Sequence, residues 1–328
     1  MQQLLIGIAA AFVAAVIFGR IFIPILRRLK FGQEIRDDGP RWHEKKSGTP
    51  TMGGFIFIAG SLAGLVVLWL LSAVMGYNMP DSVSLGMMIA MMLAYAAIGF
   101  VDDYIKVILK RNLGLTASQK FGLQLIVAVA FVSWAVLGGH IGTEIRIPFT
   151  SIVWNMGWVF IPFVVLVILA AVNSVNLTDG LDGLAASVTV VVAVFFLLIS
   201  KSGVTENTAV AFFAAVLIGG LLGFLIYNKY PAKVFMGDTG SLCLGGAVCA
   251  MAILLEEPLA LLIVGFVYVM ETLSVIMQVT SYKLTGKRIF KMSPIHHHFE
   301  MCGWSEKKIV AVFTLVTAAL CALMYFFG

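Results

Sequence analysis

Ten apolar runs, most of them about 20 residues long, follow one another along this chain and limit what it can fold into. A helix needs about 20 mostly apolar residues to cross the hydrocarbon core of a bilayer. The connectors between the runs leave no room for a separate soluble domain. We therefore predict one all-α, polytopic membrane domain over residues 1–328. The predicted spans are 3–24, 53–75, 84–103, 119–138, 158–177, 183–200, 207–227, 239–255, 258–281 and 307–327.

The composition agrees with a membrane protein and argues against a nucleic-acid partner. Hydrophobic residues make up 60% of the chain and charged residues only 12%, which is unusual for a soluble globular protein. The 22 Lys and Arg exceed the 17 Asp and Glu, but most of the basic residues lie in short loops between predicted spans. Basic residues in such loops set the orientation of the protein in the membrane. We expect no nucleic acid to bind.

The distribution of basic residues also predicts the topology. If both termini lie outside, 20 of the 22 Lys and Arg face the cytoplasm, and only Arg146 and Lys201 face outward. The outer connector at 140–157 contains T-E-I-R-I-P-F, where polar and apolar residues alternate. This pattern predicts a small extracytoplasmic hairpin, or a strand lying on the membrane surface, without catalytic groups, that caps the outer ends of the spans.

Polar residues cluster at the predicted inner ends of spans, most densely in N-S-V-N-L-T-D-G-L-D-G at 173–183. Asn173 and Asn176 are three residues apart, as are Asp179 and Asp182, so each pair shares a face of a helical turn. A carboxylate in a membrane span costs about 2.5–3.5 kcal/mol on insertion scales, so acids beside spans usually face protein, water or an ion. Packing alone does not explain four such groups on one face.

Two further clusters contain carboxylates. Asp102 and Asp103 point about 100° apart on a helix, so they are expected to do different jobs. A solvated pair at a helix end is the alternative. Lys106, one turn on, can neutralise one of them or meet a phosphate. The segment M-G-D-T-G-S places Asp238 near a helix start, with Thr239 and Ser241 as possible caps; an aspartate in such a place can still bind a metal.

Two loops complete the polar set. The segment K-K-S-G-T-P-T-M-G-G at 45–54 offers Lys and Thr side chains for phosphate oxygens, although a basic, Gly-rich loop is also common without that role. The segment S-P-I-H-H-H-F-E holds His296, His297 and His298, which cannot all face one side of a helix, and this argues against a simple three-histidine zinc site. Carboxylates, lysines and histidines at one membrane surface favour Mg²⁺-assisted phosphoryl transfer.

Five motifs carry a resemblance to a known family. They are K-S-G-T-P-T-M-G-G, F-V-D-D-Y, N-L-T-D-G-L-D-G-L, F-M-G-D-T-G-S and P-I-H-H-H-F-E, in this order from Lys46 to Glu300. Together they closely resemble the bacterial phospho-N-acetylmuramoyl-pentapeptide transferases, which belong to the polyprenyl-phosphate N-acetylhexosamine-1-phosphate transferases. The resemblance implies transfer of phospho-MurNAc-pentapeptide from its UDP carrier to undecaprenyl phosphate, giving lipid I and UMP for peptidoglycan synthesis. It also implies a Mg²⁺ cofactor, ten spans, a homodimer, and an active site on the cytoplasmic side of the bacterial plasma membrane.

The resemblance assigns roles by matching motif. Asp238 is the expected Mg²⁺ ligand and Asp102 the candidate base that deprotonates the lipid phosphate, with Asp103 as support. The three histidines are expected to assist at the phosphate or sugar end. We favour direct attack by the lipid phosphate over a covalent aspartyl intermediate, although the motifs fit both. The expected substrate contacts are Lys46, Thr51, Lys106, Asn173, Asn176, Asp179, Asp182, Asn228 and Phe235.

Two alternative functions remain open. A sister transferase that uses UDP-GlcNAc or another UDP-hexosamine would share the acidic motifs, so the last inner loop, with P-I-H-H-H-F-E, is the discriminating feature. A transporter or flippase would need no chemistry. Transporters usually place their polar groups near the membrane midplane, whereas here the clusters fall at the ends of the predicted spans.

Overall fold

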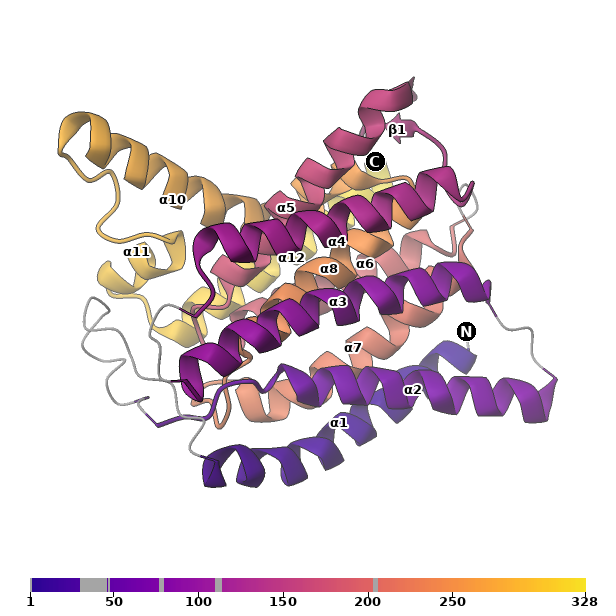
Figure 1. Cartoon of the computed structure of the whole chain (residues 1–328), viewed down its shortest axis with the longest axis horizontal. Helices are drawn as coiled ribbons and strands as arrows, with labels where there is room; N and C mark the ends of the chain where they lie inside the picture. The colour runs from indigo at the N-terminus through magenta and orange to yellow at the C-terminus, as the bar shows by residue number, and fades with distance from the viewer. Residues whose placement is uncertain (1, 30–45, 47, 77–79, 110–113, 203–205) are drawn as a thin grey trace.

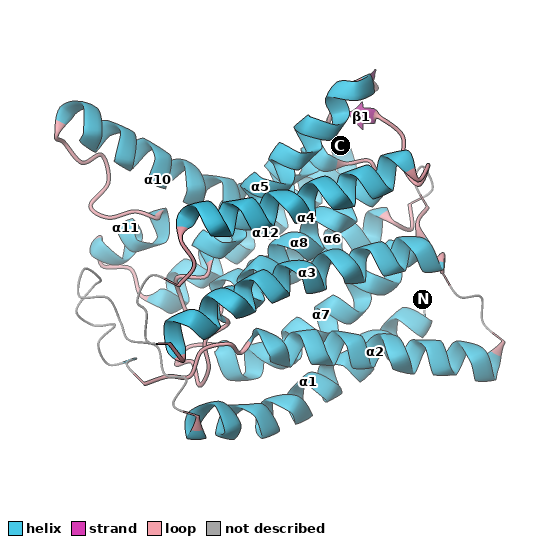
Figure 2. Cartoon of the chain, viewed as in Figure 1, coloured by secondary structure: helices cyan, strands magenta, loops and turns pink. Residues whose placement is uncertain are grey.

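The protein is a bundle of long helices with one small hairpin (Figures 1 and 2). The computed structural model describes residues 2–29, 46, 48–76, 80–109, 114–202 and 206–328. The long helices are α1 (Gln2–Arg28), α2 (Gly54–Met75), α3 (Ser82–Val107), α4 (Ala117–Leu137), α5 (Phe160–Thr178), α6 (Leu184–Ile199), α7 (Thr208–Asn228), α8 (Gly237–Leu254), α10 (Phe266–Thr285) and α12 (Glu306–Phe327). The shorter elements are β1 (Glu144–Arg146), β2 (Val153–Asn155), η2 (Gly157–Val159), η3 (Pro258–Ala260), α9 (Leu261–Val264) and α11 (Ile295–Met301).

Each predicted span has a helical counterpart, and most boundaries agree within a few residues. Within the described residues, eight helices are long and apolar enough to cross a membrane, or nine if a bent pair counts as one span. The predicted span 183–200 corresponds to α6, which is a shorter apolar helix. The chain is thus an all-helical, multi-pass membrane protein, while the count of ten spans stays a prediction.

The core of the bundle is formed by α7 and α8. Every residue of α8 from Thr239 to Leu254 is buried, and nearly all of α7 is buried as well. A helix that is apolar on all sides belongs inside a large bundle. The helices α1 and α2 pack against α7, whereas α3 and α5 flank α8 (Figure 1). The small residues Ala11 and Ala15 of α1 are fully buried and allow close helix packing.

The predicted span 258–281 is broken in the structure. The helix α9 ends at Val264, because the φ of −95° and ψ of 18° at Gly265 are not helical, and α10 begins at an angle of 81° to the segment before it. In Figure 1, α10 extends away from the bundle and α11 lies below it. The uninterrupted span was therefore wrong in shape, because a break at one glycine leaves the apolar composition unchanged on both sides.

The predicted hairpin is confirmed. The strands β1 and β2 pair antiparallel, with Ile145 opposite Trp154. Its loop is attached to the turn after α8, because the Gly142 N–H donates to Oε1 of Glu256 at 2.9 Å and Arg146 lies 3.9 Å from Glu257. In Figure 1 the hairpin and both termini lie toward the end of the bundle opposite α11. We call the other end, where α1 and α3 end and α2 and α8 begin, the polar end.

Candidate active site

The carboxylates of Asp102 and Asp238 lie at the polar end and share two lysines. Lys106 contacts both Asp102 Oδ2 and Asp238 Oδ2, the latter at 2.7 Å. Lys120, from α4, lies 3.0 Å from Asp238 Oδ2 and 4.0 Å from Asp102 Oδ2. Asp102 Oδ1 accepts a hydrogen bond from the Leu115 N–H at 2.8 Å. These groups, together with Asp103 and Asn176, form what we call the acidic cluster.

Asp103 caps the start of α8 by accepting hydrogen bonds there. Its Oδ1 accepts from the Asp238 N–H at 3.1 Å, and its Oδ2 accepts from the N–H and hydroxyl of Thr239 at 2.9 and 2.6 Å. A carboxylate that caps a helix start satisfies N–H groups that have no partner within the helix. The helices approach closely here, because a Cβ added at Gly99 would overlap the Asp238 carbonyl. Asp103 thus positions Asp238, as the different jobs predicted for Asp102 and Asp103 require.

The two asparagines of α5 have different partners. Asn176 donates from Nδ2 to Asp238 Oδ1 at 2.7 Å and to Ser241 Oγ at 2.8 Å, so it belongs to the acidic cluster. Asn173 lies one turn earlier and donates to Gln124 Oε1 at 2.8 Å. Asn173 therefore connects α5 to α4, and its predicted contact with the substrate stays a prediction.

Asp179 lies where α5 ends, between two groups of charges. Burial raises the pKa of Asp179 well above its ordinary value, and the nearby carboxylates of Asp238, Asp103 and Asp182 raise it further. This carboxyl group therefore takes up a proton more readily than a solvated aspartate. It connects the acidic cluster electrostatically to Asp182.

Lys46 forms the second charged group, which we call the lysine clamp. Its Nζ lies 2.8 Å from Asp182 Oδ1 and 2.6 Å from Glu306 Oε1. Burial acts to lower the pKa of Lys46, but the hydrogen bonds and charges of Asp182 and Glu306 raise it overall. Asp182 also accepts from the Ala232 N–H at 2.9 Å. The clamp joins the segment before α2 to the starts of α6 and α12.

The motif around Thr51 pairs with the motif before Asp238. The Phe235 N–H donates to Pro50 O at 2.8 Å, and the Gly53 N–H donates to Phe235 O at 2.8 Å. Thr51 is buried beside Gly237, whose φ of +72° favours glycine. Two motifs that are far apart in sequence, around Thr51 and before Asp238, are therefore joined by backbone hydrogen bonds. We call these paired segments the frame of Asp238.

Asn228 supports the same frame. It is 2% exposed, and its Nδ2 donates to Val234 O at 3.0 Å. Its Oδ1 has no hydrogen-bond partner among the described residues. An unpaired amide oxygen in a buried position can accept a hydrogen bond from a ligand.

The three histidines have three different environments. His296 is buried, and its Nδ1 lies 3.0 Å from Oε2 of Glu271. His297 Nδ1 lies 2.7 Å from Glu300 Oε2. His298 accepts at Nδ1 from the Lys291 N–H at 3.2 Å. These histidines, with Glu271 and Glu300, form the histidine cluster, in which each ring is oriented by its own neighbour.

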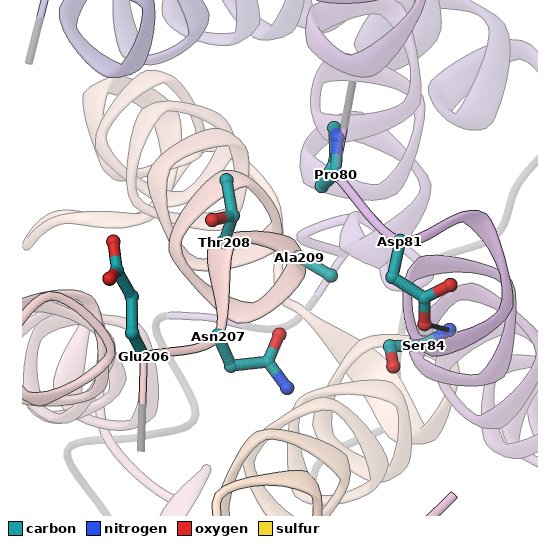
Figure 3. A pocket seen from close by; sticks show the side chains of 7 residues that line it. All are labelled: Pro80, Asp81, Ser84, Glu206, Asn207, Thr208 and Ala209. Atoms are coloured by element: carbon teal, nitrogen blue, oxygen red, sulfur yellow. Dashed lines mark hydrogen bonds between the residues drawn. The ribbon is translucent and has the colours of Figure 1, made fainter. Parts of the chain in front are cut away.

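A separate pocket of about 350 Å³ lies at the opposite end of the bundle (Figure 3). It is formed where α3 and α7 begin, and Pro80, Asp81, Glu206 and Asn207 are among its lining residues. Asp81 caps α3 there by accepting from the Ser84 N–H at 2.8 Å. None of the predicted site residues lines this pocket, so it is distinct from the candidate site.

Sequence reasoning missed four residues of the site. Glu271 and Glu306 orient His296 and Lys46, Lys120 pairs with Asp238, and Gln124 pairs with Asn173. Glu271 had a usable signal, because a lone acid inside the predicted span 258–281 is costly unless it is functional or paired. Lys120 was counted only as a cytoplasmic charge, although it follows the two aspartates on the next span.

Comparison with known proteins connects this geometry to a family. Residues 83–256 match the model described as glycosyl transferase family 4, and residues 46–58 match phospho-N-acetylmuramoyl-pentapeptide-transferase signature 1. A phospho-N-acetylmuramoyl-pentapeptide-transferase of Acetivibrio thermocellus is 52% identical over 320 residues, which cover 96% of this chain and 92% of the relative. The chain belongs to the phospho-N-acetylmuramoyl-pentapeptide transferases.

Other members of the transferase family show the same extent of similarity. A relative in Clostridium botulinum strain Alaska E43 is 50% identical over 313 residues, covering 95% of this chain and 92% of that protein. A relative in Bacillus cytotoxicus is 48% identical over 327 residues, covering 100% and 98%. The matched signature contains Lys46 and Thr51, and the family 4 match contains the whole acidic cluster. The histidine cluster lies beyond both matched segments.

Proposed function

We propose that this transferase moves phospho-MurNAc-pentapeptide from its UDP carrier to undecaprenyl phosphate, which produces lipid I and releases UMP for peptidoglycan synthesis. Family membership supports the reaction, and the relatives bear the corresponding name. The single observation that carries the mechanism is the pair Asp102 and Asp238 bridged by Lys106. Such a site combines a candidate base with cations that can hold phosphate oxygens.

In the proposed reaction, an oxygen of undecaprenyl phosphate attacks the phosphorus that carries the sugar. A new P–O bond forms, the bond from that phosphorus to the bridging oxygen breaks, and UMP leaves with the bridging oxygen. Asp102 takes the proton of the lipid phosphate. Among the described residues, its Oδ1 accepts from the Leu115 N–H, so its Oδ2, which contacts the ammonium groups of Lys106 and Lys120, would be the oxygen that receives the proton. Lys106 and Lys120 would contact the phosphates as negative charge develops.

Asp238 is the proposed ligand for Mg²⁺. The donor chemistry fits, because Asp238 and Asp102 offer carboxylate oxygens and Asn176 an amide. The described residues contain no group of three or more His, Cys, Asp or Glu side chains that could hold an ion alone. Mg²⁺ is usually held by one or two carboxylates together with substrate phosphates, which agrees with this set. When bound, the ion would neutralise charge on the diphosphate.

The lysine clamp and the frame around Thr51 are proposed to receive the nucleotide. Asp179 and Asp182 lie in the loop after α5, Asn228 is the last residue of α7, and Phe235 lies shortly before α8. The carboxylates of Asp179 and Asp182 can accept hydrogen bonds from sugar hydroxyls or from N–H groups of the base. The histidine cluster would contact the phosphate or sugar part of the substrate.

UMP release tests the function directly. Purified protein with undecaprenyl phosphate is supplied with UDP-MurNAc-pentapeptide or with UDP-GlcNAc, and UMP is measured. We expect release with the muramoyl substrate only. Release with UDP-GlcNAc only would identify a sister transferase instead, and release with neither would favour a transport function.

We also propose that the polar end faces the cytoplasm of the bacterial plasma membrane, with ten spans and both termini outside. Lys106 and Lys120 lie beside Asp238 at this end, and Lys229 and Lys233 lie between α7 and the start of α8, which supports the proposal. Cys302 is exposed near α11, whereas the other three cysteines are buried. A membrane-impermeant maleimide should label Cys302 in inverted vesicles and not in spheroplasts; the reverse labelling would invert the topology.

We infer a homodimer from the family resemblance. Molar mass of the detergent-solubilised protein, measured by light scattering with the detergent contribution subtracted, would test it. A mass equal to one 35.5-kDa chain would contradict the dimer.

A further inference from the structure

Glu271 is a buried carboxylate that none of the motifs includes. It lies in the second turn of α10 and is fully buried. A carboxylate in an apolar helix is costly unless it is paired and hydrogen-bonded. Its partners should therefore explain why an acid occurs there.

The partner of Glu271 is His296. Glu271 Oε2 lies 3.0 Å from His296 Nδ1 and 3.5 Å from the His296 backbone nitrogen. Because a carboxylate oxygen accepts, the histidine donates from Nδ1, and Nε2 of the neutral ring is left as an acceptor. Within the described residues, neither His296 Nε2 nor Glu271 Oε1 has a hydrogen-bond partner, although both are buried. The ring is thus fixed at one nitrogen and unpaired at the other.

The unpaired edge of the ring faces the loop between α5 and α6. A Cβ added at Gly180 would overlap His296 Nε2 and Cε1, so the ring lies directly against this glycine. Gly180 follows Asp179, and Asp182 of the lysine clamp lies two residues further on. The loop 179–183 therefore packs at Gly180 against the ring of His296, which Glu271 orients.

A second contact fixes α10 beside the same loop. The Thr272 hydroxyl donates to Ser174 Oγ at 2.6 Å, which ties the residue after Glu271 to α5, one turn before the loop begins. The start of α10, the ring of His296 and the end of α5 thus form one connected unit. His296 is thus the residue that lies between Glu271 and the loop.

We propose that Glu271 is a positioning residue for nucleotide binding, which acts through His296 to hold the loop 179–183 in the conformation that receives the nucleotide. The inference rests on the proposed function, because that function makes this loop face the UDP part of the substrate. A role in fold stability alone would affect melting without a specific effect on the nucleotide. The test must therefore measure binding and stability separately.

Binding of UMP to the purified protein, measured by calorimetry, provides that test. We expect Glu271→Ala to weaken UMP binding about tenfold, or about 1.4 kcal/mol, because His296 is no longer held against the loop 179–183. Glu271→Gln keeps an oxygen that accepts from Nδ1, and we expect it to remain within about threefold of the unaltered protein. Unchanged UMP binding in Glu271→Ala would overturn the inference, as would an equal loss in Glu271→Gln.

Gln278 provides a matched control on the same helix. Its side chain is mostly buried and fastens the segment after α10, by accepting from Ile289 and Phe290 N–H groups and donating to Phe290 O. We expect Gln278→Ala to lower the melting temperature but to leave UMP binding unchanged. If Gln278→Ala weakens UMP binding as much as Glu271→Ala does, the effect is general loosening of α10 and the inference fails.

A double-mutant cycle tests the contact between the ring and the loop. Gly180→Ala places a methyl group against His296 and should weaken UMP binding, whereas the same change in a His296→Ala background should cost little more. Additive losses would contradict the contact. Failure of the proposed function is recognised separately, because the unaltered protein would then release no UMP from UDP-MurNAc-pentapeptide; UMP binding that is intact but insensitive to Glu271→Ala overturns the inference alone.

Discussion

The acidic cluster and the histidine cluster lie at the same end of the bundle but are built differently. Asp102 and Asp238 stand on the long helices α3 and α8, which are in close contact, and Asp103 caps the start of α8. The histidines stand on α11, a helix of seven residues that follows the bent segment α10. Helix packing in the core sets the geometry of the acids, whereas side-chain contacts set the geometry of the histidines.

This difference predicts how each cluster responds to substitution. Conservative changes in the acidic cluster should remove chemistry and leave the frame intact, because the backbone there is held by α3, α8 and the paired motifs. Changes in and behind the histidine cluster should alter geometry and binding. The variants of Glu271 and His296 described above test the histidine cluster, and the following predictions test the acidic cluster and the charged groups beside it, in order of decreasing expected effect.

Asp238→Asn should have the largest effect on turnover. The amide keeps an oxygen that can accept from Asn176 but loses the charge that pairs with Lys106 and Lys120. We expect kcat to fall about a thousandfold, the upper range for loss of one preorganised electrostatic group. UMP release and the melting temperature are to be measured together. Asp81→Asn, at the opposite end, is the matched control and should be nearly fully active, because asparagine also caps helices.

A normal rate for Asp238→Asn would refute both the metal assignment and the view that the acidic cluster carries the chemistry. A collapsed melting temperature would instead show that Asp238 is part of the frame. Either result would contradict the proposed difference between the acidic cluster and the histidine cluster.

Lys120→Met should reduce kcat with little change in stability. Lys120 lies 3.0 Å from Asp238 Oδ2, and its loss removes one of two cations from the acidic cluster. We expect a loss of about a hundredfold, at the lower end for such a group. Steady-state kinetics with both substrates would measure it. An effect confined to the KM for the nucleotide substrate would place Lys120 with the binding residues instead.

Glu306→Gln should weaken the lysine clamp and affect stability more than chemistry. Lys46 keeps Asp182 but loses the carboxylate 2.6 Å away. We expect a destabilisation of about 1 kcal/mol, less than the roughly 1.5–3 kcal/mol of a whole hydrogen bond to a charged group, because the amide oxygen of Gln still accepts from Lys46. Thermal melting in detergent, with Glu206→Gln from the opposite end as control, would detect it. A variant that melts like the unaltered protein would show that the clamp contributes nothing to the frame.

Asp179→Asn should change the pH dependence of stability. Because burial raises the pKa of Asp179, the folded protein binds this proton more tightly than the unfolded chain does. The folded state is therefore favoured at low pH and loses stability as pH rises from the ordinary carboxyl range through the raised pKa. Without Mg²⁺, the variant should melt above the unaltered protein at about pH 8 and like it at about pH 4. A constant difference at all pH values would exclude this cause.

Much of the fold can be predicted from the sequence. The ten apolar runs match helices, and the alternation at 140–157 matches the hairpin, because both follow from periodic local patterns. The bend at Gly265 was not accessible, since a single glycine within an apolar run is compatible with a straight helix. The residues Lys120, Glu271 and Glu306 were not assigned to the site, because their partners are far away in the chain.

The amino-acid sequence alone specified the membrane helices, the motifs and the residue types that the chemistry needs. It did so because membrane insertion and helix formation depend on neighbouring residues, and because a carboxylate beside an apolar span requires a reason wherever it occurs. Only the tertiary structure decided which acid caps α8, which lysines meet Asp238, and which carboxylate orients His296. Those roles depend on helix packing and on contacts between residues more than 20 positions apart, which no local pattern encodes.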